Sequence, residues 1–168
     1  MLFGVAGNGL PSGLQYGDEI AAAAAAAANF PPCWLYAHGW QETIKVEGWL
    51  ESMGYTAANY ISGDGGHGIF QLTASVPPNW QDPKTNASYA ITQFLLPAIN
   101  YWNQKYGYTG DTLVRCVAAQ YNAGQGGAQS GHDEGDVGKF TTHTDGVSYS
   151  DLVLKYLQQL LAGRHPTG

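Results

Sequence analysis

Charged side chains are scarce in this sequence and make up only 12% of its 168 residues. The 7 Lys and Arg are outnumbered by 13 Asp and Glu and form no basic stripe, which argues against a nucleic-acid partner and against anionic membranes. No apolar run approaches the ~20 residues that span a bilayer, so we expect no membrane insertion. Asn, Gln, Ser, Thr and Tyr must therefore form most of the polar surface, which suits a neutral, hydroxyl-rich ligand such as a sugar polymer.

Cysteine is scarce too. Cys33 and Cys116 are the only two, too few for a disulfide scaffold. Both fall in predicted helices with apolar neighbours, so we expect buried thiols, and a single bridge between them is the alternative. Neither lies at a Gly-rich turn with a plausible His–Asn pair, so we expect no catalytic role for them.

The first residues, MLFGVAGNGLPSG, lack a charged segment followed by a longer apolar core, so we expect no secretory signal in them. The length suits one domain, in which about 70% of the unfolded chain's surface can be buried. The hydrophobic content of 44% is ordinary for a globular protein. We divide the chain into a loose N-terminal arm (1–16), for which docking on the domain is the alternative, one folded domain (17–163) and a flexible tail (164–168).

Helix signals dominate that domain, and we find neither repeats nor a convincing strand. Pro31 and Pro32 separate two helices, because proline is tolerated in the first turn of a helix but not in its interior. The predicted helices cover residues 18–28, 32–43, 86–106 with a kink at Pro97, 111–122 and 148–162. Segments rich in glycine or proline predict loops at 63–68, 77–83 and 124–138, and 44–62 is ambiguous. The predicted fold class is therefore all-α, with about six helices.

Glu42 is the residue most suited to acid catalysis. Leu35, His38 and Glu42 lie at i, i+3 and i+7 of a predicted helix, so Glu42 shares a stripe with residues that should face the core. Burial and the negative end of the helix dipole both raise the pKa of a carboxyl group. A glutamic acid that is still protonated near neutral pH is what a glycosidase needs to protonate a leaving oxygen.

Three short motifs follow one another along the chain: WQET at 40–43, GDGGHGIFQLT at 63–73 and QYNAG at 120–124. In this order they resemble motifs of the lytic transglycosylase and goose-type lysozyme superfamily, whose members cut the glycan strands of bacterial peptidoglycan. The resemblance covers roughly residues 31–127, with weaker support to about 161. It implies a lysozyme-like single domain with a glycan-binding cleft, acting as a monomer on a peptidoglycan glycan strand, without a metal or cofactor.

The glutamate-bearing helix of that superfamily has a pattern that this chain matches place by place, at Leu35, Ala37, Glu42 and Thr43. Glu51 is an alternative, because it precedes Asp64 at a spacing similar to that of goose-type lysozymes. Gly48 weakens any helix that carries Glu51, so we favour Glu42. Glu47 is a further alternative.

Gly68, Ile69, Phe70 and Gln71 look like the superfamily's GLMQ segment, whose backbone lines the sugar-binding cleft. Gly68 lets the main chain approach a ligand closely, while Ile69 and Phe70 anchor the segment in the core. Gln71 can offer a donor and an acceptor to sugar hydroxyls or acetamido groups, or it can brace the loop. For His67 we expect a loop residue held by hydrogen bonds, with substrate contact as the alternative.

Tyr121 and Asn122 belong to the YNAG element. In the superfamily the tyrosine hydroxyl approaches the catalytic glutamate and steadies charge near the scissile bond, so the resemblance implies a catalytic role for Tyr121 and a substrate contact for Asn122. Asp64 matches the aspartate that serves as a candidate second carboxylate in goose-type enzymes, whereas Thr73 replaces a further aspartate of that family. The superfamily also has a stretch that orders the helix beside its cleft, and this chain matches that stretch at Trp80, Asp82, Pro83 and Asn86.

The resemblance implies that Glu42 protonates the glycosidic oxygen between N-acetylmuramic acid and N-acetylglucosamine. Glu42 then takes the proton of the muramoyl C6 hydroxyl, which closes a 1,6-anhydro ring. One alternative is an inverting goose-type hydrolase with Asp64 as the second carboxylate. Another is a non-catalytic wall-binding or virion structural protein. We expect action at the bacterial cell wall, in the periplasm, after delivery by a phage, a holin or a secretion machinery.

The segment 131–146 concentrates titratable side chains, namely His132, Asp133, Glu134, Asp136, His143 and Asp145. Their spacing fits neither an EF-hand nor a zinc motif. We expect a solvated acidic loop, and contact with a metal or a cell-wall peptide is the alternative.

Overall fold

The computed structural model describes residues 4–7, 9–27, 29–143 and 146–168. Its helices are α1 (Gly17–Ala26), α2 (Pro32–Glu42), η1 (Ile44–Val46), α3 (Glu47–Ser52), α4 (Pro83–Ala90), η2 (Ile91–Leu95), α5 (Leu96–Tyr106), α6 (Gly110–Asp133), η3 (Lys139–Thr141) and α7 (Tyr149–Leu161). In the described part of the chain, extended pairing is limited to isolated bridges such as that between His67 and Leu72. The predicted all-α class is confirmed, and the ambiguous segment 44–62 forms η1, α3 and a series of turns.

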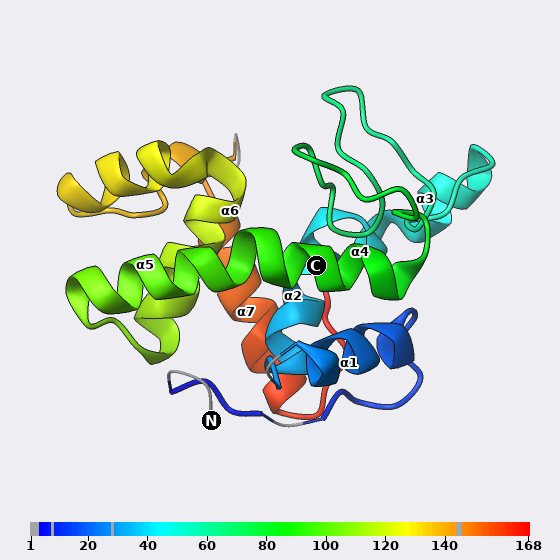
Figure 1. The fold of residues 1–168 in the computed structure, drawn as a ribbon, viewed down its shortest axis with the longest axis horizontal. Coiled ribbons are helices and arrows are strands. Elements are labelled where there is room, and N and C mark those ends of the chain that lie inside the picture. Colours follow the sequence, from blue (N-terminus) through cyan, green and yellow to red (C-terminus); the bar gives the residue numbers. More distant parts are fainter. Residues whose placement is uncertain (1–3, 8, 28, 144–145) are drawn as a thin grey trace.

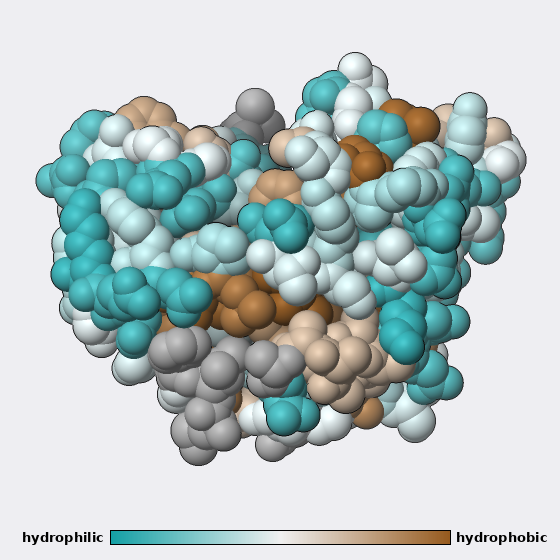
Figure 2. Space-filling model, viewed as in Figure 1, coloured by the Kyte–Doolittle hydropathy of each residue, from teal (hydrophilic) through white to brown (hydrophobic). Residues whose placement is uncertain are grey.

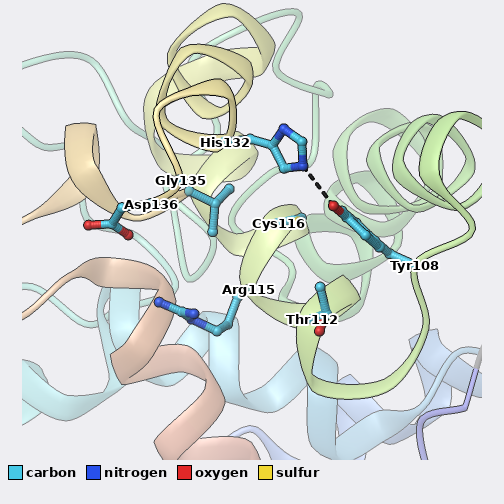
Figure 3. A pocket seen from close by; sticks show the side chains of 8 residues that line it. Tyr108, Thr112, Arg115, Cys116, His132, Gly135 and Asp136 are labelled. Atoms are coloured by element: carbon cyan, nitrogen blue, oxygen red, sulfur yellow. Dashed lines mark hydrogen bonds between the residues drawn. The ribbon is translucent and has the colours of Figure 1, made fainter.

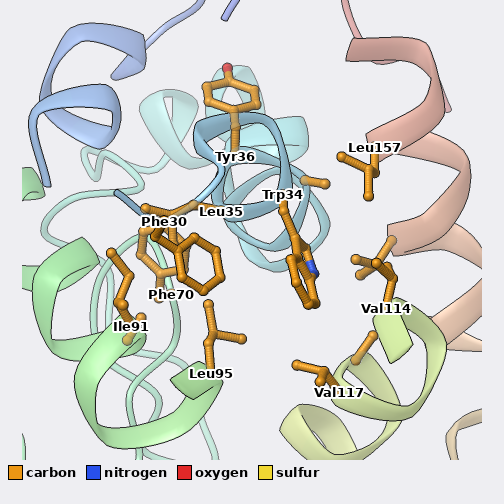
Figure 4. Packing of buried hydrophobic residues seen from close by; sticks show 14 of the residues in the cluster. Phe30, Trp34, Leu35, Tyr36, Phe70, Ile91, Leu95, Val114, Val117 and Leu157 are labelled. Carbon is orange, nitrogen blue, oxygen red and sulfur yellow. The ribbon is translucent and has the colours of Figure 1, made fainter. Parts of the chain in front are cut away.

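Helix α2 lies in the middle of the fold (Figure 1). Its residues 33–39 are all buried, since α2 packs against both α1 and α7. A helix surrounded in this way needs side chains that can be buried on every face. Figure 4 shows Trp34 and Leu35 of α2 within the core, among side chains that include Phe70, Leu95 and Val117.

Helices α4, η2 and α5 follow one another as a single rod. This rod crosses the front of the molecule in Figure 1. The sequence predicts a kink at Pro97, and the structure has the π-helical turn Ile91–Leu95 just before it. Proline lacks an N–H, and its ring clashes with the carbonyl four residues earlier. The wider π turn accommodates Pro97 without ending the helix.

The prediction of a loop over residues 124–138 is wrong for its first part. Helix α6 continues to Asp133, with a break at Gly124, where φ is 71° and ψ is 168°. Glycine adopts such angles without steric cost, so the chain changes direction at Gly124 and enters a second helical stretch. Ala128 and Gly131 are buried there, and this packing offsets the weak helix propensity of a glycine-rich segment.

The described part of the N-terminal arm, for which the sequence leaves a loose and a docked arrangement open, lies against α2. The carbonyl of Gln15 accepts a hydrogen bond of 3.1 Å from the Tyr36 hydroxyl. The thiol of Cys33 donates a weak hydrogen bond to the carbonyl of Gly9, with 3.6 Å between Sγ and the oxygen. Cys33 and Cys116 are buried and no disulfide joins them. The expectation of buried thiols is therefore confirmed, and the alternative of a single bridge is not.

Figure 2 shows mainly hydrophilic and neutral side chains on the face seen in Figure 1, with hydrophobic ones gathered in a band along its middle. Within the described residues, no helix combines the length and the apolar content needed to cross a membrane. Nor does that part of the chain bring three or more His, Cys, Asp and Glu side chains into an arrangement that could hold a metal ion. Asp145 of the titratable segment lies outside the described residues.

Candidate active site

A small pocket lies at the end of α2. It has a volume of about 130 Å³ and is lined by Glu42, Asp64, Gly66, Gln71, Thr73, Tyr121 and Asn122. Each of the three sequence motifs therefore contributes side chains to one pocket. In Figure 1, the loops of residues 53–82 and the second half of α6 both rise on the upper side of the molecule, the loops at the right and the helix at the left.

Glu42 is the last residue of α2, and Thr43 after it leaves the helical conformation with φ −141° and ψ −34°. The Thr43 hydroxyl donates a buried hydrogen bond of 2.9 Å to the carbonyl of Ile69, which ties the end of α2 to the loop. Gly39 permits this close approach, because a Cβ there would lie 3.0 Å from Cγ2 of Ile69. The helix end is thereby fixed against the segment that forms the rest of the pocket.

The pKa of the Glu42 carboxyl is raised to about 7. Burial is the main cause, because it disfavours the charged form, and the nearby charge of Asp64 acts in the same direction. A hydrogen bond from Tyr149 and the charge of Lys45 oppose the shift. At neutral pH a substantial fraction of the molecules therefore holds the proton that a general acid must supply.

Tyr149, the first residue of α7, is the main site residue that the sequence did not reveal. Its hydroxyl donates a hydrogen bond of 2.5 Å to Oε1 of Glu42. The ring is buried, and burial together with the Glu42 charge raises the pKa of the Tyr149 hydroxyl well above its ordinary value, so it stays protonated. Ser148 gives a local signal, because it caps α7 by accepting from the backbone N–H of Asp151, but no spacing links Tyr149 to Glu42.

Tyr121 lines the pocket but directs its hydroxyl elsewhere. This hydroxyl donates a hydrogen bond of 2.5 Å to the carbonyl of Phe70 rather than to Glu42. Burial raises the pKa of Tyr121 well above its ordinary value, and the Glu42 charge adds to the effect. Tyr121 therefore joins the end of the first half of α6 to the pocket loop, while the exposed Asn122 beside it borders the pocket.

Gly68 allows the loop to pack directly on Asn86. Its φ is 71°, and a Cβ there would lie 2.6 Å from Nδ2 of Asn86. The fully buried Asn86 side chain accepts from the backbone N–H of Phe70 at 2.9 Å and donates to the carbonyl of His67 at 3.1 Å. Ile69 and Phe70 are fully buried, so this segment is fixed from within the core.

Gln71 both braces the loop and borders the pocket. Its Nε2 donates a hydrogen bond of 2.8 Å to the carbonyl of Gly68, and its backbone has a left-handed φ of 47°. His67, by contrast, is not among the residues that line the pocket. Its Nδ1 lies 3.2 Å from the carbonyl of Leu72, and its ring meets that of Trp80 edge-on at 5.0 Å.

Asp64 is the exposed carboxylate of the pocket. The Ser62 hydroxyl donates a hydrogen bond to it, which is the main reason that the pKa of Asp64 is lowered. The side chain therefore stays ionised near neutral pH, while the pKa of Glu42 is raised. Thr73 also lines the pocket and offers no carboxylate.

Glu47 and Glu51, the alternatives to Glu42, do not line this pocket. Glu47 is buried and accepts hydrogen bonds from the Tyr16 hydroxyl at 2.8 Å and from the backbone N–H of Ala57 at 2.6 Å. It thus braces α3 against the N-terminal arm and the turn that follows. Glu51 is exposed on α3.

His38 lies one helical turn before Glu42 and is fully buried. Neither ring nitrogen has a hydrogen-bond partner among the described residues, and burial lowers the pKa of His38 to about 3. Its ring centroid lies 5.1 Å from that of Tyr121 and 6.3 Å from that of Tyr149. An uncharged imidazole therefore packs against both tyrosines of the site. The sequence placed His38 on the core-facing stripe but did not predict this contact.

No protein-family model and no curated protein matches this sequence.

Proposed function

We propose that this protein is a peptidoglycan lytic transglycosylase with a lysozyme-like fold, which cleaves the β-1,4 bond between N-acetylmuramic acid and N-acetylglucosamine. The observation that carries this proposal is the setting of Glu42, whose carboxyl has a pKa of about 7, accepts a hydrogen bond from Tyr149 and faces a polar pocket. The resemblance of the motifs around this pocket supports the same conclusion. The substrate puts the site of action at the bacterial cell wall.

In the first step, Glu42 gives its proton to the leaving oxygen of the N-acetylglucosamine unit while the bond from that oxygen to C1 of the muramoyl unit breaks. The carboxylate that forms is stabilised by the Tyr149 hydroxyl, which already donates to Oε1 and needs no rearrangement. The side chains of Gln71 and Asn122 border the pocket and supply hydrogen-bonding groups for the sugar substituents.

In the second step, the same carboxylate takes the proton of the muramoyl C6 hydroxyl while that oxygen bonds to C1. The product has a 1,6-anhydro ring, and Glu42 recovers its proton. One carboxyl group thus serves as acid and then as base. Neither step consumes water.

A goose-type inverting hydrolase is the second candidate, because Asp64 lines the same pocket and the hydrogen bond from Ser62 lowers its pKa. An ionised carboxylate opposite a protonated one is the arrangement that activates water in inverting glycosidases, where the two groups lie ~6.5–9.5 Å apart. Mass spectrometry of the digest separates the candidates. Anhydromuramoyl ends indicate the transglycosylase, and reducing ends indicate the hydrolase.

The purified protein should clear a suspension of peptidoglycan. Glu42→Gln should reduce that rate by ~10²–10⁴-fold, the usual contribution of a general acid, without loss of fold. Glu51→Gln is the matched control, since Glu51 is an exposed glutamate on the neighbouring α3, and it should clear at the wild-type rate. Equal clearing by Glu42→Gln and wild type would show that another residue acts as the acid. A wild-type protein that binds peptidoglycan and never clears it would support the wall-binding alternative.

A further inference from the structure

A second pocket lies where the first half of α6 meets the segment that follows its second half (Figure 3). Its volume of about 350 Å³ is in the range of sites for small organic ligands. It shares no lining residue with the Glu42 pocket. The side chains of its wall that bear on a ligand are Tyr108, Thr112, Arg115, Cys116, His132 and Asp136.

Arg115 forms an ion pair with Asp151, and the Asp151 carboxylate is in turn fixed by Ser148. Its Nε lies 2.8 Å from Oδ1 of Asp151, and Oδ2 of Asp151 accepts a hydrogen bond of 2.7 Å from the Ser148 hydroxyl. This ion pair uses the Nε edge of the guanidinium, and the side chain remains 39% exposed. The terminal nitrogens form a planar pair of donors that matches a carboxylate. The contact of Nε with Asp151 is an ion pair by distance and not a hydrogen bond within the described residues, and the terminal nitrogens of Arg115 are the groups available to a carboxylate in the pocket.

Asp136 brings the opposite charge to the same pocket. Its Oδ1 accepts a hydrogen bond of 3.0 Å from the backbone N–H of Gly138, which fixes the carboxylate. Within the described residues the ion pair of Arg115 is formed with Asp151, and Asp136 and Arg115 do not pair with each other. Figure 3 shows Arg115 and Asp136 on one side of the pocket, with Tyr108 and His132 on the other.

On the other side of the pocket, Tyr108 is held in place by contacts with its neighbours. The Tyr108 hydroxyl lies 2.7 Å from Nε2 of His132, and Nδ1 of the same ring lies 3.2 Å from Oδ1 of Asp133. The His132 ring also packs on Tyr106, with centroids 4.5 Å apart. These contacts hold the Tyr108 ring as a wall against which a short side chain can lie.

We propose that this pocket binds an α-amino acid group, in which one carbon carries both an ammonium and a carboxylate. The carboxylate pairs with the terminal nitrogens of Arg115, the ammonium meets the carboxylate of Asp136, and the remainder of the ligand extends towards Tyr108. Asp136 repels a simple anion, and a ligand that carries an ammonium beside its carboxylate can use Asp136 and the terminal nitrogens of Arg115 together. This site is independent of the proposed glycan cleavage.

Titration of the full-length, ¹⁵N-labelled protein with four probes tests the proposal. Alanine carries both charges on one carbon, N-acetylalanine lacks the ammonium, alaninamide lacks the carboxylate, and dialanine separates the two charges. Alanine should shift the amide resonances around Arg115 and Asp136 with a Kd in the mM range, and the three other probes should bind at least ~10-fold more weakly. If dialanine binds more tightly than alanine, the pocket recognises a peptide rather than a free amino acid, and the proposal is overturned.

Two variants locate the site. Arg115→Gln and Asp136→Asn should each weaken alanine binding at least ~10-fold, while the controls Arg164→Gln and Asp64→Asn should not change it. Asp136 is exposed, and asparagine can still accept from Gly138, so this variant decides the outcome if Arg115→Gln fails to fold. Absence of alanine binding, or alanine binding that both variants retain, overturns the proposal. Glu42→Gln should bind alanine like the wild type, so failure here and failure of the proposed glycan cleavage are distinguishable.

Discussion

The hydroxyl of Tyr149 donates a hydrogen bond of 2.5 Å to Oε1 of Glu42, which joins the first residue of α7 to the last residue of α2. Helix α7 packs on α2, and the Tyr149 ring is buried, so the core fixes the side of this contact that belongs to Tyr149. The contact favours the ionised form of Glu42, whereas burial favours the protonated form. The balance of these two effects puts the pKa of the carboxyl close to neutrality.

Tyr149→Phe should therefore change the pH profile as well as the rate. Loss of the hydrogen bond removes an effect that lowers the pKa of Glu42, so the alkaline limb of peptidoglycan clearing should move to higher pH. The maximal rate should fall by ~10–100-fold, because a hydrogen bond to a charged group contributes about 1.5–3 kcal/mol. Clearing rates measured between pH 5 and pH 9 give both quantities.

Tyr156→Phe is the control for that experiment. Tyr156 is also a buried tyrosine of α7, and it does not line the Glu42 pocket. Its variant should keep the wild-type pH profile. A Tyr149→Phe enzyme that keeps the wild-type alkaline limb would mean that the Tyr149 hydroxyl does not set the proton affinity of Glu42.

Glu42→Gln should stabilise the fold at alkaline pH. The pKa of Glu42 is raised from 4.5 to about 7, so the folded state binds the proton more tightly than the unfolded chain does. This contribution to stability is fully present below pH 4.5 and is lost as the pH rises through 7. At 1.36 kcal/mol per pKa unit, the loss amounts to at most roughly 3–4 kcal/mol.

Thermal unfolding of wild type and Glu42→Gln at pH 4.5 and at pH 8 measures this effect. The stability of the variant relative to the wild type should increase from pH 4.5 to pH 8, because glutamine does not titrate. Glu51→Gln should show no such gain, since Glu51 is exposed. A constant difference between Glu42→Gln and wild type across this range would contradict the raised pKa.

The parts of the fold that follow local rules could be predicted from the sequence. Pro32 starts α2 where a proline is tolerated, and the helix ends at Glu42, one residue before the predicted end. The loop motif also has a local cause, because Gly68 adopts a positive φ that suits glycine. The second half of α6 was missed because Gly124 looks like a helix end, whereas burial of Ala128 and its neighbours sustains another helical stretch.

The composition of the site depends on contacts that no local pattern encodes. Tyr149 and Glu42 are separated by 107 positions along the chain, and only the packing of α7 on α2 brings them together. Tyr121 illustrates the converse case. Its motif predicts a place near Glu42, which it has, but the direction of its hydroxyl towards Phe70 follows from where the loop is fixed.

His38→Leu should raise the free energy of unfolding. The buried imidazole has no hydrogen-bond partner for either nitrogen among the described residues, and such unpaired polar groups cost about 1–3 kcal/mol each. Burial also lowers the pKa of His38 to about 3, so the unfolded chain binds a proton more readily as the pH falls below 6.5. Wild-type stability is therefore lost towards acid, by up to about 1.4 kcal/mol per pH unit, and His38→Leu avoids this loss.

Chemical denaturation at pH 7 and pH 4 checks both parts, since the advantage of His38→Leu should grow at the lower pH. Replacement of the exposed His143 by leucine is the control, and it should leave the difference between the two pH values as in the wild type. A His38→Leu protein that is less stable than the wild type at both pH values would indicate that the imidazole has a favourable partner.

Gly68→Ala should destabilise the pocket loop by more than the strain of a positive φ alone. Gly65 and Gly68 both have positive φ, 87° and 71°, so alanine at either position is strained by about 1–2 kcal/mol. At Gly65 nothing lies within 4 Å of the added Cβ, whereas at Gly68 it would lie 2.6 Å from Nδ2 of Asn86. Asn86 cannot move aside without losing its hydrogen bonds to the loop backbone, so Gly68→Ala should be less stable than Gly65→Ala by a further ~1–3 kcal/mol.

Urea unfolding of the two variants measures that difference, and clearing of peptidoglycan reports on the pocket. Gly68→Ala should clear at least ~10-fold more slowly than Gly65→Ala, because a displaced loop moves Gln71 away from Glu42. If the two variants lose the same stability and the same activity, the close contact between Gly68 and Asn86 does not shape the site, and the strained backbone angle alone accounts for both losses.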